Sequence, residues 1–341
     1  VAFSAENSTI HRLDGITVAK INSDLTSADD ATLAETLSEN AGLCFLGMMK
    51  AGPFDIDART AKAMLQSSGN PNGRSNAEVV KPRLGAREIT QGSEDLWIID
   101  FGVDMPIEVA AEYELPFEHV RQFVKPIRET NNRPRLKNRW WIHGEARPGL
   151  RKAIHSLRKC IVTPEVAKHR IFVWMPTTVV PDHTCHVIAR EDDYFFGVLH
   201  SRPHELWSLA MCNWMGVGND PRYNSSKTFE TFPFPWPPGH EPADDPRVQA
   251  IAQAARELVE KRDRWLQADD ATAAELGAKK KSRAEARTLT NLYNQRPTWL
   301  DLAHKRLDAA VFAAYGWPAD LADQDILARL LALNHERAKA A

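Results

Sequence analysis

The chain has 341 residues, which is enough for two domains of ordinary size. Hydrophobic residues make up 43% of it and charged residues 26%, as in a typical globular protein. No segment approaches the roughly 18 apolar residues that a membrane-spanning helix needs, so the composition argues against an integral membrane protein. The net charge of −2 by itself favours no class of partner.

The first residues and the cysteines bear on where the protein works. Because Val1 is not a methionine, we expect the chain to begin inside a longer reading frame. The opening residues mix polar, acidic and basic side chains, unlike a signal peptide. The cysteines lie far apart and form no CxxC pair, which favours the reducing cytoplasm over a disulfide scaffold or a thiolate zinc site. They are Cys44, Cys160, Cys185 and Cys212.

Residues 1 to about 236 are predicted to mix strands and helices. Runs at 97–101, 171–174 and 194–199 are rich in aromatic and β-branched residues, as strands are. Shorter helical patterns lie between them. We therefore predict an α+β fold for this region.

Residues 121–170 form a basic segment that the net charge conceals. The segment holds fourteen lysines and arginines against three acidic residues, so the remainder of the chain is strongly acidic. This asymmetry is the electrostatic pattern expected for contact with a polyanion.

Two elements of the basic segment are predicted to hold a phosphate backbone. Four cations alternate with other residues between Arg133 and Arg139, and on an extended segment they would align along one side. A helix is predicted over 147–161, with an apolar stripe and cations on another face. An ordinary amphipathic helix with solvated charges is the alternative. The predicted backbone contacts are Arg133, Arg135, Lys137, Arg139, Arg147, Arg151, Lys152, Arg158 and Lys159.

A proline-rich stretch at 232–239 separates this region from the rest of the chain. Prolines at this density continue neither a helix nor a central strand, so we place a domain boundary at residue 236. Beyond it we predict a small all-α domain, with a solvated linker at 278–287. Its three helices begin near Val248, after Thr298 and near Asp323, and Gly316 and Pro318 end the second.

Motifs for independent catalysis are missing from the sequence. Amino-methylating DNA methyltransferases need an Asn/Asp-Pro-Pro-aromatic motif, and Asn70-Pro71-Asn72-Gly73 lacks both the second proline and the aromatic residue. No Gly-rich turn for S-adenosylmethionine and no P-loop is present. We assign no catalytic residue and expect the chain to be inactive alone.

One histidine pair has the spacing of helical metal ligands but lacks the rest of the motif. His200 and His204 stand four residues apart, but Ser208 occupies the place of the second histidine in a His-Glu-x-x-His helix. Packing at the start of a helix is the favoured interpretation. A second candidate set is His183, Cys185 and His186. We do not expect these residues to chelate a metal ion either, because alternate residues of a strand point to opposite faces.

Two turn-rich segments, 69–76 and 218–227, are suited to reading base edges. Asparagine pairs with adenine, arginine with guanine, and aspartate accepts a hydrogen bond from cytosine. Surface turns built by asparagine and glycine are the alternative. The predicted base-reading residues are Asn72, Arg74, Asn219, Asp220 and Arg222.

Several segments in a fixed order resemble one family over nearly the whole chain. The chain resembles the C-terminal portion of the large single-chain class I DNA methyltransferases of bacterial restriction-modification and phage-defence systems, of which the type IIL, MmeI-like enzymes are members. The segments are 70–74, 97–102, 168–174, 196–207, 228–235, 288–294 and 314–318.

The resemblance implies a division of the chain into three parts. Residues 1–30 would end or follow a methyltransferase domain that is missing here, 31–236 would form a target recognition domain, and 237–341 a helical domain. The family methylates adenine N6 with S-adenosylmethionine after flipping the base. In this family, base-reading positions lie just before the Phe-Pro-Phe-Pro stretch, which points to Gly218–Arg222.

The resemblance implies sequence-specific binding of double-stranded DNA, in the service of an adenine methyltransferase. The expected partners are DNA and the missing methyltransferase domain, with no cofactor or metal held by this chain. As the alternative, the region could be an interaction scaffold that docks the catalytic domain or a partner subunit, with incidental DNA contact.

Overall fold

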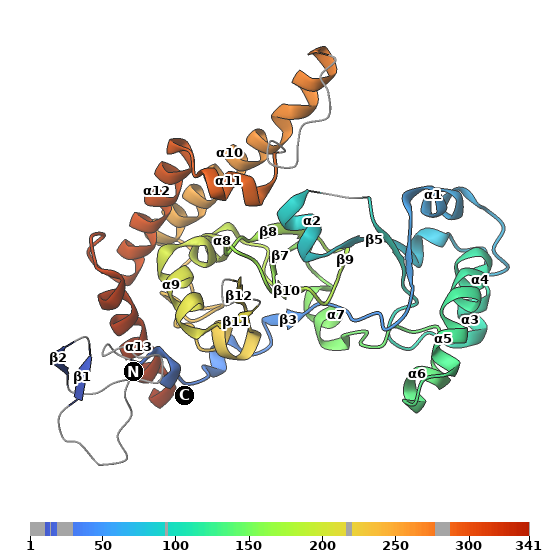
Figure 1. Cartoon of the computed structure of the whole chain (residues 1–341), viewed down its shortest axis with the longest axis horizontal. Helices are drawn as coiled ribbons and strands as arrows, with labels where there is room; N and C mark the ends of the chain where they lie inside the picture. The colour runs from blue at the N-terminus through green and yellow to red at the C-terminus, as the bar shows by residue number, and fades with distance from the viewer. Residues whose placement is uncertain are drawn as a thin grey trace.

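The protein forms two lobes along its longest axis, each built on a four-stranded sheet (Figure 1). We call them the large lobe, which contains the last helices of the chain, and the small lobe. The computed structural model describes residues 11–13, 15–18, 30–92, 95–215, 220–276 and 287–340.

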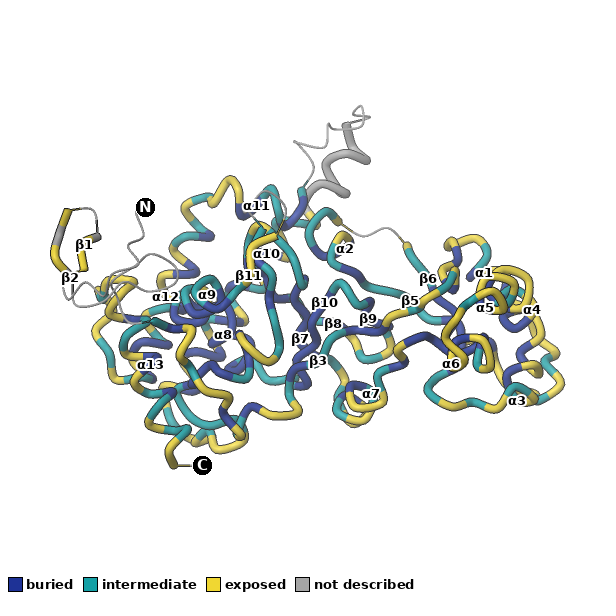
Figure 2. Tube along the Cα trace, turned by 60° about the horizontal axis from the view of Figure 1, so that its bottom comes forward, coloured by how far each residue is buried: buried dark blue, intermediate teal, exposed yellow. Residues whose placement is uncertain are grey.

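The large lobe is built on an antiparallel sheet of strand order β3-β10-β7-β8. Its inner strands are buried (Figure 2), as their runs of β-branched and apolar residues predict. The strands are β3 (Cys44–Leu46), β7 (Lys159–Pro164), β8 (Val173–Pro176) and β10 (Cys185–Ile188).

Helices cover this sheet and complete the core of the large lobe. The helix α8 packs closely on α10, because Gly197 lacks a side chain where a Cβ would lie 2.7 Å from the Ile251 side chain. The helices are α2 (Ala86–Gln91), α8 (Asp193–His200), α9 (Arg202–Met211), α10 (Pro246–Leu276), α11 (Leu289–Gln295), α12 (Thr298–Tyr315) and α13 (Asp323–Ala340).

The small lobe has the strand order β4-β6-β5-β9, in which β9 pairs parallel with β5. Because β9 lies between β8 and β10 in the chain, this pairing ties the two lobes together. The strands are β4 (Asp55–Ile56), β5 (Val80–Leu84), β6 (Trp97–Ile99) and β9 (Val180–Pro181). The helices are α1 (Ala58–Gln66), α3 (Ile107–Ala111), α4 (Glu114–Phe123), α5 (Lys125–Glu129) and α6 (Pro134–Asn138).

Short elements complete the fold, and α7 (Pro148–Ile154) lies where the chain passes from the small lobe into β7. Two hairpins, β1 with β2 and β11 with β12, form two-stranded sheets of their own. These elements are β1 (His11–Leu13), β2 (Ile16–Val18), β11 (Asn213–Met215), β12 (Asp220–Arg222), the 3₁₀ turns η1 (Ala31–Leu33), η2 (Ser38–Asn40) and η3 (Asn76–Glu78), and the π turn η4 (Ser225–Phe229).

The α+β class is confirmed, and so are several elements. β6 lies within the predicted strand at 97–101, and α10, α12 and α13 match the three predicted helices. Gly316 ends α12 with a φ of 70°, the left-handed conformation that glycine adopts most readily. Among the described residues, no helix is long and apolar enough to span a membrane.

The strand predicted at 194–199 is wrong, since these residues lie in α8. All of them are buried, and a segment buried on every side shows no helical periodicity. The overlooked signal was Asp192, whose carboxylate accepts a hydrogen bond from the Phe195 backbone and caps the helix.

The single helix predicted over 147–161 is also wrong. The helix ends at Ile154, and β7 begins at Lys159. Ile161 therefore does not continue the apolar stripe of Leu150 and Ile154, but lies in a strand buried on both faces.

The hydrophobic core of the large lobe continues across the boundary predicted at residue 236. Phe232 and Phe234 are fully buried, and the hydrophobic cluster of the large lobe takes residues from both sides of the proline-rich stretch. The division into 31–236 and 237–341 stays a prediction. Most of 1–30, and the linker predicted at 278–287 except Arg287, lie outside the described residues.

Candidate nucleic-acid interface

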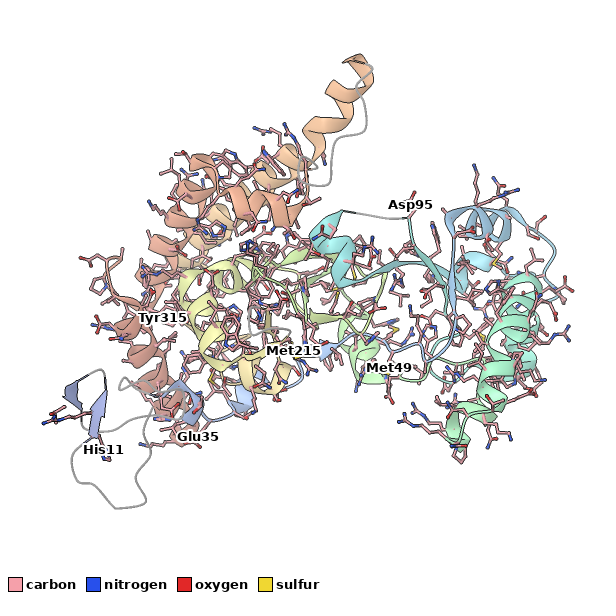
Figure 3. All side chains as sticks on the ribbon, in the orientation of Figure 1. His11, Glu35, Met49, Asp95, Met215 and Tyr315 are labelled. Carbon is pink, nitrogen blue, oxygen red and sulfur yellow. The ribbon has the colours of Figure 1, made fainter. Side chains whose placement is uncertain are left out.

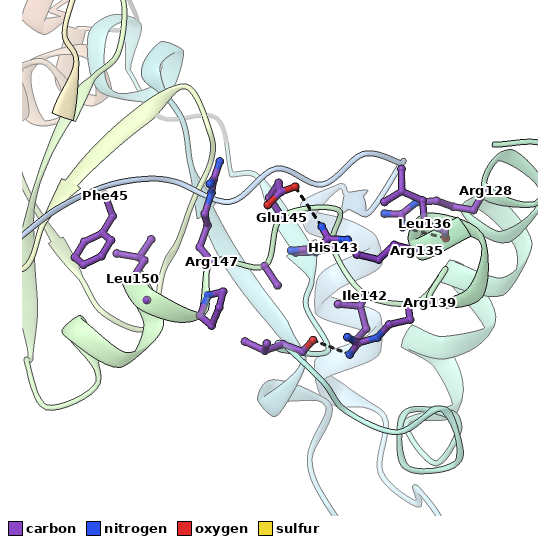
Figure 4. A pocket seen from close by; sticks show the side chains of 14 residues that line it. Phe45, Arg128, Arg135, Leu136, Arg139, Ile142, His143, Glu145, Arg147 and Leu150 are labelled. Atoms are coloured by element: carbon purple, nitrogen blue, oxygen red, sulfur yellow. Dashed lines mark hydrogen bonds and ion pairs between the residues drawn. The ribbon is translucent and has the colours of Figure 1, made fainter. Parts of the chain in front are cut away.

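An arginine-lined cleft of about 370 Å³ lies between the lobes. Arg135 of α6 and Arg139, which caps the end of α6, reach it on one side, and Arg147 reaches it from the start of α7 on the other (Figure 4). Phe45 and Leu136 contribute apolar surface to the walls. The cleft therefore combines positive charge with a partly apolar lining.

The extended segment predicted for 133–139 is wrong, since α6 forms there. Residues two apart on a helix point in different directions, whereas residues four apart share a side. Helical geometry therefore accounts for why Arg135 and Arg139 both line the cleft, while Lys137 does not. Arg133 precedes the helix and is exposed.

Arg135, Arg139 and Arg147 each have one described contact, which orients the guanidinium. Arg139 donates from Nη2 to the Val103 carbonyl (2.8 Å), and Arg147 from Nε to the Gly47 carbonyl (3.2 Å). Arg135 Nη2 lies 3.2 Å from Glu145 Oε1. Because a guanidinium carries five N–H donors, each can still bind a phosphate.

The backbone of Arg147 adopts a conformation that is rare for a residue with a side chain. Its φ of 54° and ψ of 63° place it in the left-handed region, directly before Pro148 starts α7. Such a conformation costs on the order of 1–3 kcal/mol and often marks a functional position. In this fold it turns the chain into α7 at the edge of the cleft.

Arg128 shapes the cleft, and no pattern in the sequence distinguishes it from the other arginines of the basic segment. It is 1% exposed, and it donates from Nη2 to the Lys50 carbonyl (2.7 Å) and from Nε to the Ala51 carbonyl (2.9 Å). Burial and the neighbouring Arg135 lower the pKa of Arg128 to about 10, so it stays charged at neutral pH. It thereby fastens α5 to the segment that leads from β3 into the small lobe.

Arg151 binds an internal acid rather than facing solvent freely. Its Nη2 lies 2.8 Å from both carboxylate oxygens of Asp100, which is buried in the small lobe. Burial alone would raise the pKa of Asp100, but neighbouring groups lower it overall. The groups that lower it are the adjacent His143 and then Arg151, and Arg151 also donates hydrogen bonds to the carboxylate.

The other predicted backbone contacts lie on or near α7. Lys152 is exposed, and the Arg158 side chain is 91% exposed. Lys159 lies over the Trp174 ring, 3.6 Å from its centroid, and 3.7 Å from Asp193. Lys152 and Arg158 are therefore accessible to a polyanion, while Lys159 is partly engaged.

The loop that contains Asn72 and Arg74 is built by its own side chains. Asn72 Oδ1 accepts a hydrogen bond from the Arg74 backbone, and Arg74 pairs with Glu78 at 2.9 Å. Asn70 also donates to the Arg74 carbonyl. This geometry is that of an asparagine-stabilised turn, the alternative that the sequence left open.

The hairpin β11–β12 carries the second set of predicted base-reading residues. Asp220 is half-buried, and Arg222 donates from Nε (3.0 Å) and Nη2 (2.7 Å) to Glu165 Oε1. Asn219 lies outside the described residues. Met215, labelled in Figure 3, marks the exposed strand β11. Glu165 was missed because 57 positions separate it from its partner, and no local spacing reveals such a pair.

His200 and His204 are buried in the large lobe and bonded to other groups. His200 Nε2 accepts a hydrogen bond from the Phe172 backbone (3.2 Å), and His204 Nε2 lies 3.1 Å from the Tyr223 hydroxyl. Among the described residues, no group of three or more His, Cys, Asp or Glu side chains could hold a metal ion.

Known proteins share sequence features and the fold of this chain. The family model "MmeI, target recognition domain" matches residues 51–236, more than half of the chain. A solved structure of the type IIL restriction-modification enzyme MmeI in complex with DNA has a similar fold, with a TM-score of 0.69 and 16% sequence identity. That match covers 95% of this chain and 39% of MmeI. No curated protein matches the sequence.

Proposed function

The chain belongs to the MmeI target recognition domain family, and we propose on this basis that it recognises a specific sequence in double-stranded DNA. The family match over residues 51–236 is the observation that carries the proposal. The fold it shares with a portion of MmeI, an enzyme solved in complex with DNA, and the arginine-lined cleft support it.

In this proposal the cleft and α7 bind the phosphate backbone. Arg135, Arg139 and Arg147 contribute from the cleft walls, and Lys152 from the exposed side of α7. Phosphate contacts fix the register and orientation of a protein on the duplex without reading its sequence. Arg151 contributes to this surface indirectly, because its bond to Asp100 holds α7 against the small lobe.

The base sequence is read by the hairpin β11–β12. Arg222 is suited to guanine, because a guanidinium donates two parallel hydrogen bonds to its O6 and N7. Asp220 is suited to the amino group of cytosine. Glu165 orients the Arg222 guanidinium before DNA arrives.

The larger enzyme in this proposal is a site-specific adenine-N6 methyltransferase. The chain spans about two fifths of MmeI, and it lacks the motifs that hold S-adenosylmethionine and the target amino group. The cofactor and the methyltransferase domain would therefore belong to the rest of that enzyme. This chain would place the duplex so that the target adenine reaches the catalytic domain.

Fluorescence anisotropy with a mixed-sequence duplex tests the proposal. Between about 50 and 200 mM salt we expect the affinity to fall roughly tenfold or more, because each neutralised phosphate releases counterions. Arg139→Ala should weaken binding to all sequences equally, whereas Arg222→Ala should cost about 1–3 kcal/mol at one base position. Absence of binding at low salt would contradict the proposal and favour the interaction scaffold.

A further inference from the structure

The hairpin β11–β12 is a two-stranded antiparallel ribbon whose register assigns each side chain to a face. Asn213 lies opposite Arg222, and Met215 lies opposite Asp220. Directly opposed residues and those two apart share a face of an antiparallel pair. These four side chains therefore form one face, which we call the reading face.

The remaining pair of the ribbon forms the opposite face. Trp214 lies opposite Pro221, which is buried. Asn213 and Met215 are exposed, and the Arg222 side chain is 42% exposed. The face of the pair Trp214 and Pro221 is attached to the large lobe at Pro221 and leaves Trp214 52% exposed, while the reading face presents polar and apolar groups outward.

The ribbon is anchored to the core by a buried cation. Arg170 donates to the carbonyls of Pro164 (2.5 Å) and Pro221 (3.1 Å), and its guanidinium lies 4.9 Å from the centroid of the Tyr223 ring. A backbone bridge between Val166 and Arg222 joins β12 to the end of β7. A recognition element needs such rigid support, because discrimination between bases depends on precise hydrogen-bond geometry.

We propose that the β11–β12 ribbon enters the DNA major groove with its reading face toward the bases, and that Asn213 reads a base next to the one bound by Arg222. The inference rests on the proposed function and adds a specificity-determining residue. A two-stranded ribbon fits the major groove, where asparagine pairs with adenine and an apolar side chain contacts the thymine methyl group. Met215 supplies that apolar contact.

The neutral side chain of Asn213 makes the inference separable from electrostatic binding. Removing a cation that neutralises a phosphate weakens binding to every duplex and reduces its salt dependence. Removing Asn213 leaves the charge unchanged, so it alters the preference at one base pair only. The position of that base pair relative to the one read by Arg222 reports the geometry of the ribbon.

The experiment selects preferred duplexes from a randomised pool with the wild-type chain. Anisotropy then measures affinities for the selected duplex and all its single-base-pair variants, with wild type, Asn213→Ala, Arg222→Ala and Gln253→Ala. Gln253, an exposed amide on α10, is the matched control. We expect Asn213→Ala to lose a roughly 5- to 150-fold preference at one base pair, adjacent to the pair affected by Arg222→Ala, with an unchanged melting temperature.

A second variant protects the test against a folding defect. Asn213→Asp keeps the size of the side chain but only accepts hydrogen bonds, so the preference should move from adenine to cytosine. The inference is wrong if both variants keep every wild-type preference, or if they weaken all duplexes equally. Sequence-selective binding in which the Asn213 variants keep every preference would overturn this inference alone, whereas binding without any preference, or no DNA binding, would overturn the proposed function as well.

Discussion

At the scale of single residues, the burial of the acid partner decides the role of an arginine that has one. Arg151 is bonded to the buried Asp100, Arg222 to the half-buried Glu165, and Arg135 to the exposed Glu145. A buried pair is costly to break because it leaves an uncompensated charge, whereas an exposed pair contributes little to stability. A basic segment is thus divided into cations that hold the fold and cations that remain available to DNA.

Arg151 and Lys152 test this division, because they are neighbours on α7 with opposite surroundings. Arg151→Ala should lower the free energy of unfolding by about 3–5 kcal/mol, since it strands the Asp100 carboxylate. Lys152→Ala should change stability by less than about 0.5 kcal/mol and reduce the slope of log affinity against log salt by about 1. Urea unfolding and anisotropy measure the two effects, and equal losses of stability would refute the division.

At the scale of secondary-structure elements, helical phase determines which cations line the cleft. The α6 helix turns Arg135 and Arg139 into the cleft and Lys137 away from it. On an extended strand, all three would have shared one side. The positive charge that a ligand meets in the cleft therefore depends on the helix as well as on the number of basic residues.

Alanine substitutions along α6 test the helical phase. Arg135→Ala and Arg139→Ala should each weaken binding to a mixed-sequence duplex more than Lys137→Ala, because only the first two line the cleft. Anisotropy at about 50 mM salt measures the difference, and circular dichroism checks the helix content of each variant. If Lys137→Ala has the largest effect, the cleft does not hold the backbone.

At the scale of the whole molecule, neutral histidines inside the large lobe link stability to pH. Burial lowers the pKa of His204 to about 3 and those of His186 and His304 to about 4. The unfolded chain binds protons on these groups near pH 6.5, whereas the folded protein does not. Stability is therefore fully present above pH 6.5 and declines as the pH falls toward 4.

Equilibrium unfolding in urea between pH 7 and pH 5 tests this linkage. We expect the free energy of unfolding to fall by about 1–2 kcal/mol for each buried histidine over that range. His304→Gln should make the fall in the free energy of unfolding between pH 7 and pH 5 smaller by the contribution of one histidine, about 1–2 kcal/mol. A stability that stays constant from pH 7 to pH 5 would show that these histidines take up protons as readily in the folded protein.

The elements that the sequence predicted well are those with a local signal. The helices α10, α12 and α13 repeat apolar residues at helical spacing. Gly316 marks the end of α12, because the last turn of that helix needs a left-handed residue whatever the surroundings. The buried helix α8 was mistaken for a strand because its surroundings, rather than its own periodicity, decide its form.

By itself the sequence determined the basic segment, the helical C-terminal region and the lack of catalytic motifs. It also singled out the segment around Arg222 as a candidate for reading bases. Each of these depends on residues close together in the chain. Only the tertiary structure decided which cations are paired with an acidic side chain and which remain available to DNA. Arg151 meets Asp100 across 51 positions and Arg222 meets Glu165 across 57. The cross-strand position of Asn213 likewise became visible only in the register of the ribbon. Charge pairing and burial depend on distances in space, which the order of residues does not specify until the chain has folded.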